Sequence, residues 1–462
     1  MSKTMKRFAK ISVLSYVLAF TLLWCTNVRV SAYKAVPSAV AAEEKLDENT
    51  EFVKRVSALP HVKQVKRIAT NQYPEKYVLK IEHPLDYAHP EKGSFMQRVF
   101  VGHVGFDRPT VLVTEGYGGE REMNASSAEE ISKLLKANLI FVEYRYFQES
   151  MPEPCNWDYL TVENSLNDLH EVATTFKQLY MHKWLATGIS KGGQTCMFYR
   201  AYFPDDVDVS VPYVAPLNKA VEDGRHEPFL THKVGNAVER QAVLDFQIEV
   251  LKRRAVMEPM LEKFCKEKDY QFNEGVGIPE VLDMIVLEYS YALWQWGTNV
   301  HRIPDLKSDD ETLFKHLVAT SGPDYFRPDP YFLSFFVQAA RELGYYGYDT
   351  KPLKKYLSIK NSKGYLHRLM LPKELQGIKF SSELYRRTVK FLKQNDPKMI
   401  YIYGENDPWS SSGVCTWLDF SKKENMHLYV DPNGSHSARI ATLPPTQREE
   451  CIALLKQWME CE

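Results

Sequence analysis

Three residue types that together can carry out acyl transfer occur along this chain in the order Ser190, Asp407 and His436. A serine hydroxyl is a weak nucleophile until a neighbouring base, most often an imidazole, takes its proton. A carboxylate beside the imidazole holds the correct tautomer and stabilises the charged form. The three residues therefore predict a nucleophile, an orienting acid and a general base, with Asp431 as an alternative acid.

The local sequence around Ser190 supports this interpretation. Ser190 is the centre of Gly188-Ile189-Ser190-Lys191-Gly192, a G-x-S-x-G pattern between a short apolar strand and a helix predicted from Gln194 to Phe203. Glycines on both sides let the strand and the helix crowd around a sharp turn, which lifts the hydroxyl out of the sheet. The pattern is short enough to occur by chance, so its weight depends on the partner residues.

The two partner residues each follow a predicted strand. Asp407 comes after Met399–Tyr403, and His436 comes after His427–Val430. In open α/β sheets, functional groups gather at the carboxyl ends of the strands. The order nucleophile, acid, base is typical of the α/β-hydrolase fold.

The first half of the chain alternates between strands and helices. The predicted strands are Lys76–Ile81, Met96–His103, Thr110–Thr114, Leu139–Tyr144 and Val207–Val214, and the predicted helices are Asn124–Ala137 and Thr161–Tyr180. Ser127 and Glu130 would form a capping box in the first helix. This alternation predicts a doubly wound, mostly parallel sheet.

From about Pro216 to Asn395 the pattern is helical and rich in aromatic residues. The predicted helices are Asn236–Lys268, Pro279–Trp296, Asp329–Leu343 and Ser382–Lys393, and a closing helix is predicted at Thr446–Met459. We expect a catalytic domain of residues 33–215 and 396–462, with residues 216–395 inserted as a helical cap. Most of the aromatic residues are expected to form the core of that cap.

A serine nucleophile also needs backbone donors for the oxyanion. The N–H of Lys191, the residue after the nucleophile, is predicted to be one donor. The second is expected from the loop Glu115–Gly119 after the third strand, where Tyr117 and Gly116 are the two candidates. Its glycines let the backbone approach a tetrahedral intermediate closely.

The composition is that of an ordinary globular protein. The 462 residues carry a net charge of −1, with 44 % hydrophobic and 25 % charged residues. A neutral chain of this kind argues against nucleic-acid binding. No Cys or His spacing indicates a metal site, and we predict no metal and no cofactor.

The N-terminus resembles an export signal. Basic residues up to Lys10 precede an apolar run from Ile11 to Cys25, and Val30-Ser31-Ala32 fits a cleavage site. The run of about 15 residues is shorter than the roughly 20 that span a bilayer. We expect residues 1–32 to be a signal peptide of a bacterial protein that is periplasmic, surface-held or secreted, with no stable membrane insertion afterwards. Trp24 makes Cys25 a poor lipid-attachment site.

Six cysteines remain after the predicted cleavage. They are Cys155, Cys196, Cys265, Cys415, Cys451 and Cys461. An exported chain is expected to form one or two disulfides, although the sequence does not determine their pairing. Cys196, on the helix behind Ser190, is interpreted as a small buried hydrophobe.

Several longer motifs resemble known peptidases. Thr114–Gly118, Gly188–Thr195 and Trp294–Gly297 are similar to the secreted bacterial prolyl tripeptidyl aminopeptidases. Glu143–Ser150 and Tyr159–Thr161 also resemble the related lysosomal prolyl carboxypeptidase and dipeptidyl peptidase II family. The likeness extends over nearly the whole mature chain. It implies a serine exopeptidase that releases tripeptides, often ending in proline, from free N-termini.

Two residues of the elbow bear on this resemblance. Lys191 favours the tripeptidyl aminopeptidases, because the second family usually has an aromatic residue at that position. Ile189 stands where a small residue is expected, which concerns fine specificity rather than the nucleophile.

An aminopeptidase must bind the ammonium group of its substrate, which is a peptide with a free N-terminus. Buried carboxylates can do so through charge-assisted hydrogen bonds, and Glu115, Glu143 and Glu288 are the candidates. A proline pocket needs flat aromatic walls, for which Trp409 is a candidate beside Trp294 and Trp296. The oligomeric state is left open.

Three alternatives accompany this prediction. A lipase or esterase on the same fold would share the three catalytic residues and differ in its cap. A dipeptidyl peptidase or prolyl carboxypeptidase-like enzyme would differ in the peptide that it releases. A binding protein on an inactive hydrolase scaffold is disfavoured because all three residue types are present.

Overall fold

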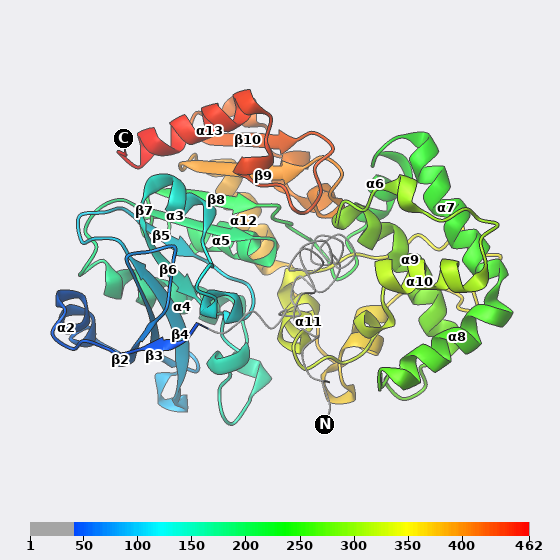
Figure 1. Cartoon of the computed structure of the whole chain (residues 1–462), viewed down its shortest axis with the longest axis horizontal. Coiled ribbons are helices and arrows are strands. Elements are labelled where there is room, and N and C mark those ends of the chain that lie inside the picture. Colours follow the sequence, from blue (N-terminus) through cyan, green and yellow to red (C-terminus); the bar gives the residue numbers. More distant parts are fainter. Residues whose placement is uncertain (1–40, 462) are drawn as a thin grey trace, which may run out of the picture.

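The computed structural model describes residues 41–461, so the predicted signal peptide at residues 1–32 lies outside the described residues. Ten strands form one sheet in the order β1-β2-β3-β4-β6-β5-β7-β8-β9-β10 (Figure 1). The strands are β1 (Glu43–Glu44), β2 (Val62–Ile68), β3 (Glu75–Pro84), β4 (Ser94–His103), β5 (Thr110–Val113), β6 (Asn138–Val142), β7 (Trp184–Ile189), β8 (Val209–Tyr213), β9 (Met399–Gly404) and β10 (Met426–Asp431).

The sheet has an antiparallel part and a parallel part. Strands β1 to β4 pair antiparallel, and β4 pairs antiparallel with β6. From β6 through β5, β7, β8 and β9 to β10 every neighbouring pair is parallel. The central strands β5, β8 and β9 are buried at every residue, which explains their largely apolar sequences. This topology is the α/β-hydrolase fold and confirms the predicted fold class.

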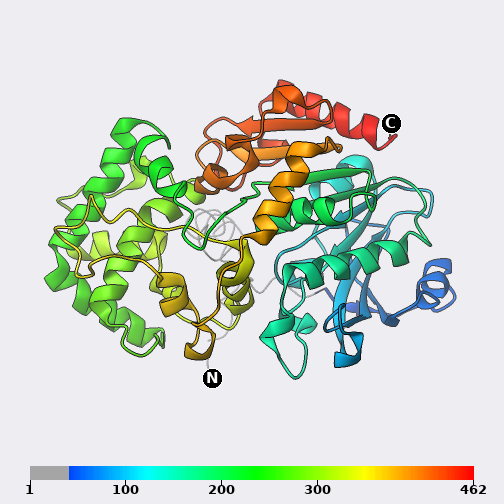
Figure 2. The same cartoon turned by 180° about the vertical axis from the view of Figure 1, so that it is seen from behind.

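Helices cover both faces of this sheet. The flanking helices are α3 (Glu130–Leu135), α4 (Val162–Phe176), α5 (Lys191–Tyr202), α12 (Glu383–Gln394) and α13 (Pro445–Trp458), and a short α2 (Glu51–Ser57) packs on β2. One apolar cluster contains residues of α4, α5 and α12. A second cluster, on the other face, contains residues of α3 and α13. The orange α12 lies in front of the sheet when the molecule is seen from behind (Figure 2).

The chain between β8 and β9 is mostly helical and supplies most of a third apolar cluster, which also includes Tyr117, Tyr144 and Trp409. Its helices are α6 (His226–His232), α7 (Ala237–Lys252), α8 (Arg254–Glu267), α9 (Ile278–Gln295), α10 (Asp310–Thr320) and α11 (Leu333–Gln338). Helices α6 to α10 lie beside the sheet (Figure 1). Helix α9 is central, because α7, α8 and α10 all pack against it. Most of the aromatic residues of this segment line that cluster.

The structure differs from the sequence prediction in several helices. The helix predicted at 124–137 is reduced to α3, and the predicted Ser127 capping box is wrong. The carboxylate of Glu129 caps α3 by accepting the N–H groups of Ile131 and Ser132, while Ser127 donates to Glu122. Glu129, which directly precedes the helix, therefore takes the capping position that was expected for Ser127.

The predicted helix at 236–268 is divided into α7 and α8 at Arg253. At this break, the Arg253 guanidinium donates hydrogen bonds to the carbonyl oxygens of Leu306 and Ser308, in the loop before α10. Helix α12 was expected to belong to the cap, and in the structure it packs against α5 beside the sheet.

The cysteines also differ from expectation. All six cysteines between residues 41 and 461 are free, so the predicted disulfides are not present. Cys196 is fully buried, in agreement with its interpretation as a small hydrophobe.

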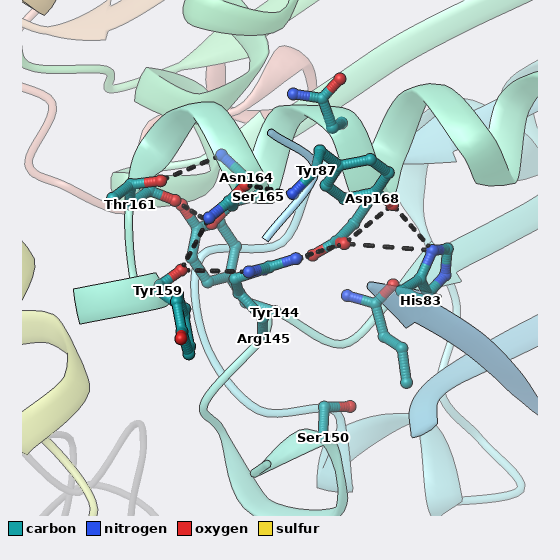
Figure 3. A network of polar contacts seen from close by, with 12 residues as sticks. His83, Tyr87, Tyr144, Arg145, Ser150, Tyr159, Thr161, Asn164, Ser165 and Asp168 are labelled. Carbon is teal, nitrogen blue, oxygen red and sulfur yellow. Dashed lines mark hydrogen bonds and ion pairs between the residues drawn. The ribbon is translucent and has the colours of Figure 1, made fainter. Parts of the chain in front are cut away.

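A buried polar network ties the loop after β6 to helix α4 (Figure 3). The Arg145 guanidinium binds both carboxylate oxygens of Asp168 at 2.7 Å. The same guanidinium donates to the carbonyl oxygens of Leu85 and Tyr159. Both charged side chains are buried, and bidentate pairing with additional hydrogen bonds is the geometry that compensates such burial. The network therefore fixes the start of the loop that follows Tyr144.

The same network contains a histidine that stays neutral. The ring of His83 is buried, and its Nδ1 lies 2.9 Å from the Tyr87 hydroxyl, which in turn donates to Asp168. Burial lowers the pKa of His83 to about 4, and the nearby Asp168 carboxylate opposes this shift only in part. A histidine in an unfolded chain has a pKa of about 6.5. Below that pH, His83 therefore binds a proton in the unfolded state but stays neutral in the folded state until the pH approaches 4.

We expect the free energy of unfolding to decrease as the pH falls from about 6.5 towards 4 because of His83. The contribution of this residue between pH 7 and pH 5 is about 2 kcal/mol. Urea unfolding at both pH values would measure it, with His83→Asn as the comparison. The wild type should lose about 2 kcal/mol more than the variant, and equal losses would contradict a neutral His83.

Candidate active site

Ser190 occupies the turn between β7 and α5 in a strained backbone conformation. Its φ is 59° and its ψ is −117°, a region that residues with a side chain rarely adopt. Strain of this kind persists only where the surroundings hold it, and it concentrates at functional sites. The conformation is that of a nucleophile elbow.

The glycines around Ser190 are required by space. A Cβ on Gly188 would lie 2.3 Å from the Gly192 carbonyl oxygen, and one on Gly193 would lie 2.6 Å from the Tyr213 carbonyl oxygen. The Thr114 hydroxyl donates to the Gly192 carbonyl at 2.9 Å. The elbow is thus clamped against the end of β5 and the end of β8.

Asp407 and His436 form a hydrogen-bonded pair. His436 Nδ1 lies 2.7 Å from Asp407 Oδ2, and both side chains are buried. An ionised carboxylate only accepts, so Nδ1 donates and Nε2 carries the lone pair of the neutral ring. Within residues 41–461, Nε2 has no hydrogen-bond partner. The ring is therefore oriented, with one nitrogen available to accept a proton.

The alternative acid Asp431 has a different environment. Its backbone carbonyl accepts the N–H groups of Glu405 and Gly434, and Asp407 is the carboxylate that contacts the His436 ring. Asp407 follows β9 and His436 follows β10, while Ser190 follows β7. Because β7 to β10 are parallel, the three residues lie at the same edge of the sheet.

The cap contacts the loop that carries the histidine. The His436 backbone N–H donates to the carbonyl oxygen of Gln295, the last residue of α9, at 2.9 Å. The Trp296 ring packs edge-on to the imidazole at a centroid distance of 6.1 Å. Gly297 adopts a φ of 66°, and a Cβ there would lie 3.1 Å from Ser435. The end of α9 thus holds the His436 loop in place.

The predicted oxyanion donors lie against each other. Lys191 is the first residue of α5, and the first N–H groups of a helix have no intrahelical partner. The loop Glu115–Gly119 packs directly on it, because a Cβ on Gly116 would lie 2.6 Å from Lys191 Cγ. The backbones at Lys191 and Tyr117 are therefore held in adjacent positions.

Two of the three candidate glutamates are paired with arginines. Glu115 lies 2.9 Å from Arg121, and Glu143 binds Arg98 while also accepting the N–H of Gly119. These pairs neutralise both carboxylates. Their contacts support a structural role for Glu115 and Glu143.

Glu288 has a different environment. It is buried on α9, and its Oε2 accepts the hydroxyls of Tyr346 at 3.0 Å and Tyr348 at 2.7 Å. In the part of the chain that the structure describes, no Lys, Arg or His forms an ion pair with it. Burial raises the pKa of Glu288 to about 8. A buried carboxylate without a cation is suited to a cationic ligand.

Aromatic rings connect Glu288 with His436. The Trp409 ring lies 6.4 Å from the His436 ring and 5.2 Å from the Tyr346 ring, measured between centroids. Tyr346 in turn donates to Glu288. Trp409 therefore packs against both the His436 ring and the Tyr346 ring, whereas Trp294 packs on Gly235.

Sequence reasoning missed the residues that surround Trp409 and Glu288. These are His226, Tyr291, Tyr345, Tyr346 and Tyr348. The segment Tyr345-Tyr346-Gly347-Tyr348 was a usable signal, because three tyrosine hydroxyls in four residues need polar partners when buried.

Neither a metal-binding cluster nor a membrane-spanning helix is found among residues 41–461. No group of three His, Cys, Asp or Glu side chains between residues 41 and 461 could hold a metal ion. None of the described helices combines the length and the hydropathy needed to cross a bilayer.

A strained serine on a strand–helix turn, with an Asp–His pair at the same sheet edge, defines a serine hydrolase of the α/β-hydrolase fold. The chain belongs to the PS-10 peptidase S37 family, whose model matches residues 48–461. It is therefore a serine peptidase.

The name of one relative agrees with the resemblance that the motifs indicated. The prolyl tri/tetrapeptidyl aminopeptidase of Streptomyces mobaraensis is 27 % identical over 448 residues, which cover 95 % of this chain and 91 % of the relative. Among solved structures, the proline iminopeptidase of Mycobacterium smegmatis matches with 12 % identity and a TM-score of 0.37, over 86 % of this chain and 99 % of that one. An esterase of Pyrobaculum calidifontis matches with 12 % identity and a TM-score of 0.35, over 88 % of each chain.

Proposed function

We propose that this serine peptidase releases tripeptides, with proline at P1, from free N-termini, with Ser190, Asp407 and His436 as its catalytic residues. The observation that carries the proposal is the Asp407–His436 hydrogen bond of 2.7 Å at the sheet edge where the elbow presents Ser190. The name of the Streptomyces relative supports the substrate class.

The proposed reaction follows from the groups at this edge. Ser190 Oγ attacks the carbonyl carbon of the scissile bond while His436 Nε2 takes the hydroxyl proton. The backbone N–H groups of Lys191 and Tyr117 stabilise the oxyanion of the tetrahedral intermediate. His436 then gives the proton to the leaving amine, and an acyl-enzyme remains. Water attacks this ester with His436 again as the base, which frees the peptide and restores Ser190.

Glu288 is the proposed binding site for the substrate ammonium. Among residues 41–461, it alone of the three candidate glutamates is buried without a cation, and the Trp409 and Tyr346 rings connect it with His436. Three residues in an extended conformation span about 10 Å, so the ammonium group of the substrate would lie about that far from Ser190. Trp409 supplies a flat surface for the proline ring.

One comparison of substrates tests this proposal. Purified protein from Tyr33 to Glu462 would be assayed on Ala-Ala-Pro-p-nitroanilide and on its N-acetylated form. We expect rapid cleavage of the free amine only. Equal cleavage of both would indicate a peptidase without an ammonium site. Cleavage of a nitrophenyl ester alone would replace the peptidase with an esterase.

Replacement of Glu288 by glutamine is expected to lower kcat/KM on Ala-Ala-Pro-p-nitroanilide by about 10- to 100-fold, mainly through KM. The reason is the loss of a charge-assisted hydrogen bond worth roughly 1.5–3 kcal/mol. Glu115→Gln is the matched control, because Arg121 already pairs with that carboxylate. Equal effects of the two substitutions, or an equal loss on a nitrophenyl ester, would contradict an ammonium site at Glu288.

We also propose that the chain is exported from a bacterial cell after removal of residues 1–32. The basic start, the apolar run and the small residues before Tyr33 support this proposal. N-terminal sequencing of the protein recovered outside the cytoplasm should begin at Tyr33. An intact N-terminus retained in the cytoplasm would contradict export.

A further inference from the structure

The side chain that follows the nucleophile is a buried lysine inside an aromatic box. Only 2 % of Lys191 is exposed. Its Nζ lies 3.4 Å from the centroid of the Tyr144 ring, 5.2 Å from that of Phe147 and 5.5 Å from that of Tyr117. Nζ donates a hydrogen bond to the carbonyl oxygen of Gly116.

Burial of the Lys191 amine is unfavourable for the free energy of folding. Burial lowers the pKa of the Lys191 amine well below its ordinary value, and the carboxylates of Glu115 and Glu342 oppose the shift only in part. Across the described residues no carboxylate lies within ion-pair distance of Nζ. A methionine would fill the same aromatic box without this penalty. The amine therefore has a use other than packing.

The role of the Lys191 amine follows from its contact with the Gly116 carbonyl oxygen. The peptide unit between Gly116 and Tyr117 is planar and trans, so its C=O and its N–H point in opposite directions. A donor that fixes the Gly116 carbonyl oxygen therefore also fixes the direction of the Tyr117 N–H. Gly116 must be glycine for this contact, because a Cβ there would lie 2.7 Å from Lys191 Cβ.

We infer that the Lys191 side chain is a positioning residue for the oxyanion hole. Lys191 would contribute one donor through its own backbone N–H and would orient the second, the Tyr117 N–H, through Nζ. This inference rests on the proposed role of Ser190 as nucleophile, and it does not depend on which peptide is released.

A second set of contacts holds the same loop from the opposite end. The Tyr117 carbonyl oxygen accepts the backbone N–H of Tyr144 at 3.0 Å. Tyr144 precedes Arg145, whose guanidinium is anchored by Asp168 in the network of Figure 3. The carbonyl oxygens on both sides of the Tyr117 Cα therefore accept hydrogen bonds. That of Gly116 accepts from Lys191, and that of Tyr117 accepts from Tyr144. The Tyr117 N–H has little freedom to turn while both contacts are present.

Lys191→Met and Lys191→Gln test the inference on two substrates. Ala-Ala-Pro-p-nitroanilide reports peptide cleavage, and p-nitrophenyl acetate reports acyl transfer without any need for an ammonium site. We expect Lys191→Met to lower kcat on both by about 10- to 100-fold with KM within about twofold, because an oxyanion donor is misdirected. Lys191→Gln keeps a donor and should recover part of the loss. If only the ester is cleaved, the proposed substrate is wrong while the lysine is still tested.

Affinity for a peptide boronate separates positioning from packing. The boronate forms a tetrahedral adduct with the serine, so its affinity should fall by the same factor as kcat in Lys191→Met. Binding of an uncleaved substrate in a Ser190→Ala background should not change. Lys191→Met with wild-type kcat, or Lys191→Gln no better than Lys191→Met, would overturn the inference. If Lys191→Met does not fold, Lys191→Gln is compared with the wild type alone. An intermediate loss of kcat that is matched by an equal loss of boronate affinity supports the inference, and wild-type kcat and boronate affinity contradict it.

Discussion

Ser190→Ala is expected to lower kcat by about 10⁶-fold, the effect of removing the nucleophile from another serine peptidase. The variant should fold normally, because alanine fits the space of serine at the elbow. Substrate binding should persist, since the proposed binding residues Glu288 and Trp409 remain. The residual rate would come from the oxyanion donors and from binding.

A fluorophosphonate probe gives a direct measurement of this effect. The probe should label the wild type and leave Ser190→Ala unlabelled. Ser437→Ala is the matched control, because Ser437 is an exposed serine next to His436 and should leave labelling intact. Labelling of Ser190→Ala at the wild-type rate would show that another residue is the nucleophile.

Asp407→Asn is expected to lower kcat by about 10⁴-fold with little change in the fold. The asparagine amide can donate to His436 Nδ1, which would leave the proton on Nε2. Nε2 could then no longer accept the proton of Ser190. The 2.7 Å distance between Asp407 and His436 makes this tautomer change the expected result.

The comparison with Asp431→Asn identifies the orienting acid. Asp431 contributes to the loop through its backbone carbonyl, so its substitution should leave kcat within a few-fold of the wild type. The ratio of the two effects, measured on Ala-Ala-Pro-p-nitroanilide, should therefore exceed about 10³. A larger loss for Asp431→Asn than for Asp407→Asn would reverse the assignment.

The proposed catalytic residues can be located in the sequence because their positions depend on local patterns. Ser190, Asp407 and His436 each follow an apolar strand, and parallel strands bring their carboxyl ends to one edge. The fold followed from the same alternation of strands and helices. The sequence favours Asp407 as the acid and leaves Asp431 as an alternative, because both residues follow strands. Their three-dimensional contacts distinguish them.

The surroundings of the site depended on contacts between distant parts of the chain. Glu115, Glu143 and Glu288 look alike in the sequence, and Arg121 and Arg98 determine which two are neutralised. The bond from Lys191 to Gly116 joins residues 75 positions apart. No helical or strand periodicity reports such pairings. The predictions of the Ser127 capping box and of the disulfides were wrong for a related reason. Glu129 competes with Ser127 for the cap, and the fold determines which cysteines can meet.

Helix α9 carries Glu288 in its middle and ends at Gln295, whose carbonyl oxygen binds the backbone N–H of His436. The carboxylate and this anchor are separated by about two helical turns, or about 10 Å along a rigid rod. That length is close to the span of three extended peptide residues. If Glu288 binds the substrate ammonium as proposed, α9 sets the distance between His436 and the far end of the substrate. Product length would be set by the pitch of α9 rather than by the walls of a pocket.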